Sequence, residues 1–313
     1  MSRPRWAAWL AMGLGLLVIV LAIRALLANW NSASAQPLEW QLRPSWLALA
    51  LLLVLVAFVV LVEGWRRILA SMGDELHFMT AARIWTLSSL GKYVPGKVWA
   101  TAGAVIMSQR AGASGTNALT AALAMQGLAV ASGILVCGVL GIGADRIGST
   151  GEPVLLVLAA CASLGVLALL SPALVQQINA VLPAPLPPLR PLSVRALVAG
   201  FGTNVVAWVA YGMALIALAR GSLPGVVLPF GEATGIFAAG YLAGLVAVIT
   251  PGGLGVREGA LVLLLTPLTG PRVALALAVA SRVLFTVADL LAAAPFLLWR
   301  DRTASPSAPR SAP

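Results

Sequence analysis

The sequence predicts an all-α membrane protein, a polytopic bundle of helices. Hydrophobic residues make up 60% of its 313 residues, only 10% are charged, and the mean hydropathy is +0.97. A soluble domain carries about a quarter charged residues. Several apolar runs reach the roughly 20 residues that a helix needs to cross a bilayer, and they are too long for barrel strands. Because backbone amides in hydrocarbon must be satisfied internally, we expect these runs to be helices and expect no soluble catalytic domain.

Six apolar runs are long enough to be full spans. They cover residues 6–29, 45–64, 116–142, 153–171, 195–219 and 272–299. The first run resembles a cleavable signal peptide, because Arg3 and Arg5 precede it and Ala33-Ser34-Ala35 follows it. Its apolar core extends to Ile23, however, which is longer than the roughly 7–15 residues of a signal peptide. We therefore expect an uncleaved first helix.

Two further apolar stretches, 78–110 and 230–267, are interrupted by proline and glycine. The first interruption is Tyr93–Lys97, and the second is Thr250–Gly255. Proline removes a backbone donor and glycine relaxes the backbone, so each interruption is predicted to separate two half-helices. The halves of the first stretch are too short to cross a bilayer alone, which favours a re-entrant hairpin. The second stretch is either a hairpin or two tilted crossings.

An internal repeat becomes visible when the chain is displaced by 156 residues. Pro95-Gly96 then falls on Pro251-Gly252, and Gln126 falls on Arg282. Each half, 6–142 and 153–299, contains two spans, a broken hairpin and a final span. Because three spans separate equivalent elements, the halves are predicted to insert with opposite orientation. Inverted repeats with paired Gly/Pro breaks are typical of transporters, whose site lies near the bilayer midplane between the repeats.

The net charge of +10 is explained by topology rather than by nucleic acid, for which we expect no role. Most basic residues sit at the ends of apolar runs, where they set orientation and meet anionic headgroups. With the N-terminus inside, eleven arginines lie on cytoplasmic flanks and five on outer flanks. This bias predicts a cell (plasma or inner) membrane protein with both termini cytoplasmic. Residues 1–302 would form one membrane domain, and the Ser, Ala and Pro-rich tail 303–313 would be disordered.

The first interruption nearly matches a nucleotide-binding phosphate loop but does not qualify as one. Val98 replaces the Ser or Thr that holds magnesium, and a proline occupies the loop. The segment is better interpreted as an anion site, because a half-helix that starts after Pro95-Gly96 exposes backbone N–H groups and the positive end of its dipole. Lys92 and Lys97 would add cationic heads there, with Tyr93 beside them. The alternative is that both lysines only extend to the membrane surface.

The second interruption carries an ionic pair of residues, Arg257-Glu258, inside an otherwise apolar stretch. Each charge costs about 2.5–3.5 kcal/mol at the centre of a membrane helix unless it is paired or hydrated. Adjacent helical residues do not face each other, so their partners must lie elsewhere. Arg282 and Asp289 are the candidates, since seven residues place them on one face of the last span. The alternative role is a structural ion network that locks the hairpin to that span.

The sequence offers no sign of a cofactor or of hydrolytic chemistry. A single histidine and no Cys/His cluster argue against zinc and haem, and no cofactor is expected. The interruptions and the last span together supply the candidate substrate-binding residues, with no catalytic or metal-ligating residue among them. These are Lys92, Tyr93, Pro95, Gly96, Lys97, Pro251, Gly252, Gly253, Arg257, Glu258, Arg282 and Asp289.

Two segments, Ser88–Trp99 and Thr250–Gly259, resemble the lysylphosphatidylglycerol synthase transmembrane family, the flippase-like domain of MprF-type proteins. The resemblance covers roughly residues 5–300. It implies two inverted repeats with broken helices and movement of a lipid between leaflets, either an aminoacylated phosphatidylglycerol or a polyprenyl-linked or hopanoid lipid. Because the chain ends soon after the last span, we expect no aminoacyl-transferase domain and no synthase activity.

These observations predict a flippase or scramblase-like transporter of an anionic phospholipid or a sugar-linked, polyprenyl lipid. The headgroup would cross through a polar cavity between the repeats. One alternative is a non-transporting membrane subunit that recruits a glycosyltransferase or lipid synthase partner. Another is a membrane-embedded enzyme that acts on a lipid headgroup.

Overall fold

The computed structural model describes residues 41–94, 98–140, 192–223, 225–246, 253 and 255–298, with isolated positions 173, 176, 177 and 180. Within these ranges the ordered elements are all helical, which confirms the all-α prediction. Four helices are long and apolar enough to cross a membrane. They are α2 (Pro44–Ser71), α5 (Gly115–Val139), α8 (Val194–Ser222) and α11 (Pro271–Leu298).

These four helices correspond to the spans predicted at 45–64, 116–142, 195–219 and 272–299. The spans predicted at 6–29 and 153–171 lie outside the described residues, as does the tail 303–313. The domain boundaries and the cytoplasmic position of the termini therefore stay predictions.

Shorter helices form the two interrupted stretches. The first stretch contains α3 (Phe78–Ser89), the 3-10 turn η1 (Leu90–Tyr93) and α4 (Val98–Arg110). The second contains α9 (Phe230–Val246) and α10 (Val256–Thr269). At a rise of about 1.5 Å per residue, each of these helices is shorter than the roughly 30 Å of bilayer hydrocarbon. Both predicted interruptions are confirmed, whereas the re-entrant insertion stays a prediction.

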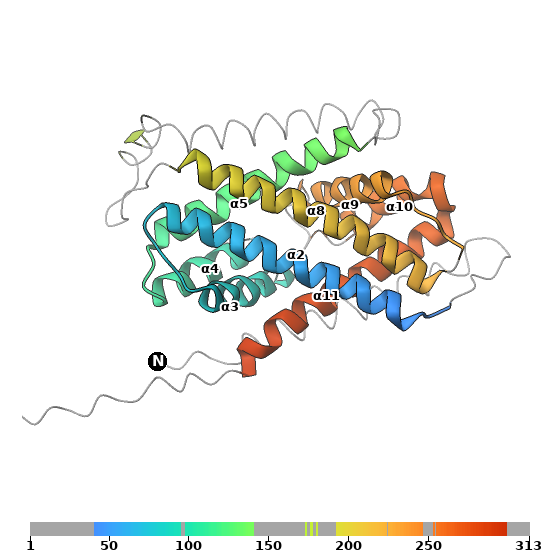
Figure 1. Cartoon of the computed structure of the whole chain (residues 1–313), viewed down its shortest axis with the longest axis horizontal. Coiled ribbons are helices and arrows are strands. Elements are labelled where there is room, and N and C mark those ends of the chain that lie inside the picture. The colour runs from blue at the N-terminus through green and yellow to red at the C-terminus, as the bar shows by residue number, and fades with distance from the viewer. Residues whose placement is uncertain are drawn as a thin grey trace, which may run out of the picture.

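Helices α2 and α8 lie side by side in antiparallel directions (Figure 1). The start of α2 meets the end of α8, where the Arg43 N–H donates to the Gly221 carbonyl at 2.8 Å. Further along the pair, Gly64 faces Thr203, whose hydroxyl would collide with any Cβ at position 64. Glycine therefore allows these two helices to approach closely in the middle of the bundle.

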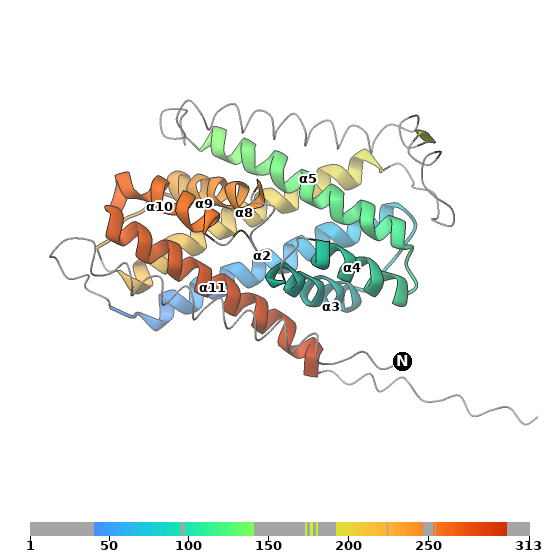
Figure 2. The ribbon, with the colours of Figure 1, turned by 180° about the vertical axis from the view of Figure 1, so that it is seen from behind.

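Corresponding helices of the two predicted halves run in opposite directions. Displaced by 156 residues, α5 covers 271–295, which coincides with α11 (Pro271–Leu298). Figure 2 shows α5 and α11 running in opposite directions across the bundle. This is the relation that an inverted repeat requires, although the duplication itself stays a prediction.

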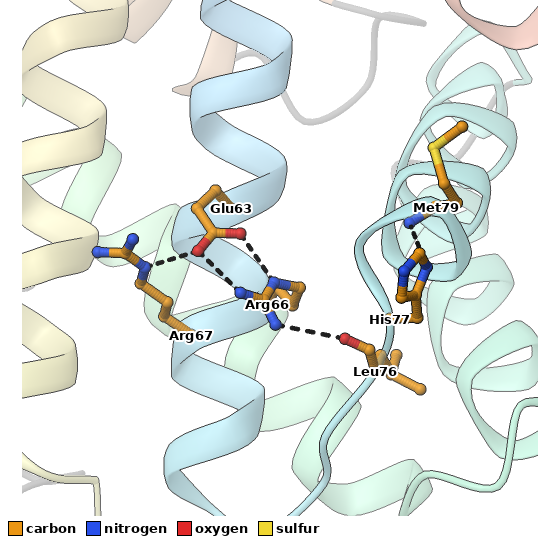
Figure 3. A network of polar contacts seen from close by, with 6 residues as sticks. All are labelled: Glu63, Arg66, Arg67, Leu76, His77 and Met79. Carbon is orange, nitrogen blue, oxygen red and sulfur yellow. Dashed lines mark hydrogen bonds and ion pairs between the residues drawn. The ribbon is translucent and has the colours of Figure 1, made fainter.

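A charged network closes the corner between α2 and α3 (Figure 3). The Glu63 carboxylate accepts from Arg66 Nε at 2.7 Å and from Arg67 Nε at 2.7 Å. Arg66 also donates to the Leu76 carbonyl at 3.4 Å, which ties the end of α2 to the following loop. The sequence predicts only an ordinary helix end here, and the structure adds this tie between helix and loop.

Buried hydrophobic side chains form two large clusters. One gathers around Trp65, Ile68 and Leu128, where α2, α3, α4, α5 and the start of α8 meet. The other gathers around Tyr211 and Phe237, where α8, α9, α10 and α11 meet. The candidate site lies between the two.

Candidate functional site

A cavity of about 490 Å³ opens between the two hydrophobic clusters. Trp65 from the first cluster and Tyr211 from the second both line it, together with residues from α3, η1, α4, α5, α9, α10 and α11. Among the described residues, three charged side chains belong to its lining, namely Lys92, Arg257 and Asp289. Lys92 directly precedes the first interruption, Arg257 follows the second, and Asp289 lies in the last span. The cavity therefore joins the three parts of the chain that the sequence analysis selected.

Asp289 is a buried carboxylate that receives two donors on one oxygen. Its Oδ2 accepts from Lys92 Nζ at 2.6 Å and from the Tyr93 hydroxyl at 2.6 Å. The Asp289 side chain is 2% exposed, whereas that of Lys92 is 39% exposed. Asp289 lies nine residues before the end of α11, roughly 13 Å along the helix axis. This ion pair fixes the first interruption to the interior of the last span.

Arg257, the second residue of α10, is buried without a compensating anion among the described residues. Its guanidinium carbon lies 5.0 Å from the ring centre of Phe237 and 4.8 Å from that of Phe285. Nε and Nη2 are buried and make no hydrogen bond. Cation–π contacts return only part of the cost of removing a guanidinium from water. Arg257 is thus a cation held ready for an anion that this part of the chain does not supply.

Close packing of α9 against α10 sets the position of Arg257. A Cβ at Gly244 would lie 3.0 Å from Arg257 Cβ, and a Cβ at Gly240 would lie 2.9 Å from the Leu261 side chain. The small-xxx-small spacing of these glycines therefore brings the start of α10 onto the backbone of α9.

Glu258 has two partners at the start of α10. Its Oε2 accepts from the Gly255 N–H at 2.8 Å and so satisfies one of the exposed donors of the helix N-terminus. Its Oε1 lies 3.4 Å from Arg282 Nη1. Gly255 has φ = 83°, a left-handed conformation that glycine adopts without strain. The predicted pairing of the Arg257-Glu258 segment with Arg282 is confirmed through Glu258.

The structure corrects the partner predicted for Asp289. The sequence analysis offers this carboxylate as a partner for Arg257, but its contacts are with Lys92 and Tyr93. The physical reason is that Asp289 lies about two turns beyond Arg282 on α11, where it reaches η1 rather than the start of α10.

Of the remaining predicted residues, the structure describes Gly253. Gly253 has φ = 70°, and a Cβ there would lie 2.9 Å from the Gly244 backbone. It also contributes to the cavity lining. Five other predicted residues lie outside the described residues, namely Pro95, Gly96, Lys97, Pro251 and Gly252.

The family known as the lysylphosphatidylglycerol synthase TM region matches residues 8–293. The chain belongs to this family. The match confirms the resemblance of the two interrupted segments, and with the four spanning helices it makes the chain a membrane protein. No curated protein matches the chain.

Within this lysylphosphatidylglycerol synthase TM region, the uncharged residues that line the cavity are not predicted from the sequence. Trp65, Trp85 and Tyr241 line the cavity, and Gln126 from α5 lines it as well. Aromatic residues inside apolar helices are usually core residues, so their spacing alone did not select them. A signal was present at Gln126, which the 156-residue displacement places on Arg282.

Proposed function

We propose that this protein moves an anionic lipid between the two leaflets of the membrane, as a flippase or a scramblase-like transporter. The headgroup would enter the cavity between the two hydrophobic clusters, while the acyl chains remain in the bilayer. In this proposal the protein transports the lipid without modifying it. It resides in the plasma or inner membrane with both termini in the cytoplasm.

The observation that carries the proposal is the buried, unpartnered edge of Arg257. Nε and Nη2 point to the same side of a guanidinium, which is the edge that binds two oxygens of one phosphate or carboxylate. A lipid phosphate is the anion that a membrane itself supplies. Arg257 is 8% exposed, so an arriving phosphate would bind it in an environment of low dielectric, where the attraction is strong.

Lys92 supports the same function from the other side of the cavity. Its side chain is 39% exposed although it pairs with Asp289, and it belongs to the cavity lining. With Asp289 neutralised by Lys92, the charged lining residues that the structure describes have one positive charge in excess. That excess matches a headgroup with a single phosphate diester.

The test reconstitutes the purified full chain in liposomes with a fluorescent phosphatidylglycerol and measures how fast dithionite bleaches the inner-leaflet lipid. We expect acceleration by the native chain and a roughly 10- to 100-fold slower rate for Arg257→Gln, since charged hydrogen bonds contribute about 1.5–3 kcal/mol. Arg195→Gln is the matched control, because Arg195 is an exposed arginine at the start of α8.

Two results would overturn the transport proposal. One is the absence of acceleration for every lipid tried, and the other is an Arg257→Gln rate equal to that of the native chain. Co-purification of a transferase with a silent chain would favour the supporting-subunit alternative instead.

A further inference from the structure

We infer that the cavity selects a lipid whose one phosphate carries an uncharged, hydroxyl-bearing ring, and that it discriminates against aminoacylated headgroups. This inference rests on the proposed function, because it specifies the headgroup that the same cavity would hold. Its basis is the charge, the aromatic content and the neutral hydrogen-bonding groups of the lining.

Among the described residues, the one carboxylate of the lining already pairs with a lysine. Asp289 is the only acidic residue of the lining among the described positions, and Lys92 and Tyr93 both occupy Oδ2. Glu258, the next carboxylate, is engaged by the Gly255 N–H and by Arg282. An ammonium group attached to the headgroup would therefore enter a lining of net positive charge, where it would compete with Lys92 for Asp289 and find no anion to offset Arg257. Like charges brought together in a desolvated site repel each other strongly, so such a headgroup would be disfavoured.

Aromatic rings are concentrated in the lining. Six of its 23 residues are aromatic, against 6% of the whole chain, so the cavity is enriched in flat apolar surfaces. They are Phe58, Trp65, Trp85, Tyr211, Tyr241 and Phe285. Trp65 and Trp85 form a tilted pair with ring centres 6.1 Å apart. Such rings pack against the C–H face of a polyol ring, which is apolar although its rim carries hydroxyls.

Neutral polar groups accompany these rings. Gln126, Tyr241 and Thr101 bring an amide and two hydroxyls to the lining, from α5, α9 and α4. Amides and hydroxyls both donate and accept, so they can match the hydroxyls around a ring without requiring a charge. A cavity of about 490 Å³ is within the usual range for small-molecule sites and is large enough for one such headgroup.

The experiment measures binding and transport separately on the full chain. For binding, the purified protein is mixed with equal amounts of phosphatidylinositol, phosphatidylglycerol, phosphatidylcholine and lysyl-phosphatidylglycerol of identical acyl chains. Native mass spectrometry then reports which lipids stay bound. We expect phosphatidylinositol to be retained best, phosphatidylglycerol next, and lysyl-phosphatidylglycerol at least tenfold less than phosphatidylglycerol.

One variant tests the contact with the headgroup ring, and another tests a neutral hydroxyl of the lining. Trp85→Leu should lower retention of phosphatidylinositol several-fold relative to phosphatidylglycerol, because only the former has a ring to pack on the indole. Trp99→Leu is the matched control, since Trp99 is 54% exposed and is not part of the lining. Tyr241→Phe keeps the ring and removes one hydroxyl, so it should weaken retention of both lipids without disturbing the fold.

Each outcome decides something. Equal or stronger retention of lysyl-phosphatidylglycerol overturns the inference, and so does a preference for phosphatidylcholine, which would mark the rings as a quaternary-ammonium site. Retention of none of the four lipids, or of all four equally, overturns it as well. The expected binding order without any transport in liposomes would support the inference and overturn only the proposed function.

Discussion

The two interrupted stretches each bring one cation to the cavity, and the surroundings of the two cations differ. In the first stretch, Lys92 lies 2.6 Å from the Asp289 carboxylate. In the second, Arg257 has two buried nitrogens without a hydrogen bond and is flanked by Phe237 and Phe285. A satisfied ion pair holds a fold together, whereas an unsatisfied buried cation destabilises it. The first stretch is therefore chiefly a structural tie, and the unsatisfied cation of the second is the one on which the proposed lipid binding rests.

The largest loss of stability is expected when Lys92, the more exposed partner of the Lys92–Asp289 ion pair, is replaced. Lys92→Met leaves the Asp289 carboxylate buried without a cation, which costs about 3–5 kcal/mol for a buried pair. We expect a large drop in the apparent melting temperature, measured by tryptophan fluorescence in detergent.

Asp289→Asn should be milder than Lys92→Met, because the Lys92 ammonium can turn to water and the Tyr93 hydroxyl retains an acceptor. Combining the two changes should restore part of the stability lost by Lys92→Met alone. Equal losses for both single variants, with no recovery in the double variant, would show that the pair is not the tie.

The next largest loss of stability is expected where the backbone packs closely beside each interruption. A Cβ at Gly91 would lie 2.7 Å from the Ala100 nitrogen, and one at Gly253 would lie 2.9 Å from the Gly244 backbone. We expect Gly91→Ala to cost about 1–3 kcal/mol through overpacking. Gly253→Ala should cost about 1 kcal/mol more, because φ = 70° is unfavourable for alanine.

The control for these variants is Gly138→Ala in α5, where nothing lies within 4 Å of the added methyl. Melting temperature and the monodisperse fraction on size exclusion would both be measured. A Gly138→Ala loss as large as that of Gly253→Ala would contradict the role assigned to these contacts.

A third substitution, at Arg257, is expected to leave the melting temperature unchanged or to raise it. Arg257→Met removes a buried charge whose unmade hydrogen bonds cost about 1–3 kcal/mol each, so the melting temperature should hold or rise. Lipid transport should fall in the same variant. Arg282→Met is the comparison, because it leaves Glu258 without its cation and should lower the melting temperature. A lower melting temperature for Arg257→Met would mean that Arg257 is structural.

The smallest effect is expected at the α2–α3 corner, away from the cavity. Glu63→Gln weakens the contacts with Arg66 and Arg67, but those arginine side chains are 31% and 58% exposed. Partly exposed ion pairs contribute about 0–1 kcal/mol. The melting temperature should therefore change by only a few degrees, and the transport rate should be unchanged.

The interruptions and the Glu258–Arg282 pair could be predicted because their signals are local. Proline and glycine mark the breaks, and a charge in an apolar helix demands a partner on a nearby helical face. The contact of Lys92 with Asp289 could not be predicted, because the two residues are 197 positions apart and lie in different predicted halves. The Phe237 and Phe285 contacts of Arg257 escaped for another reason, since aromatic residues in apolar helices carry no distinguishing pattern.

Helix α11 contacts both interruptions through residues seven positions apart. Arg282 reaches Glu258 at the second interruption, and Asp289 reaches Lys92 and Tyr93 at the first. Helix α11 therefore connects the two interrupted stretches to each other. A rotation or axial slide of α11 would strain both connections together, so we expect the two interrupted stretches to move together. Cross-linking α11 either to η1 or to the start of α10 should accordingly restrain both interrupted stretches.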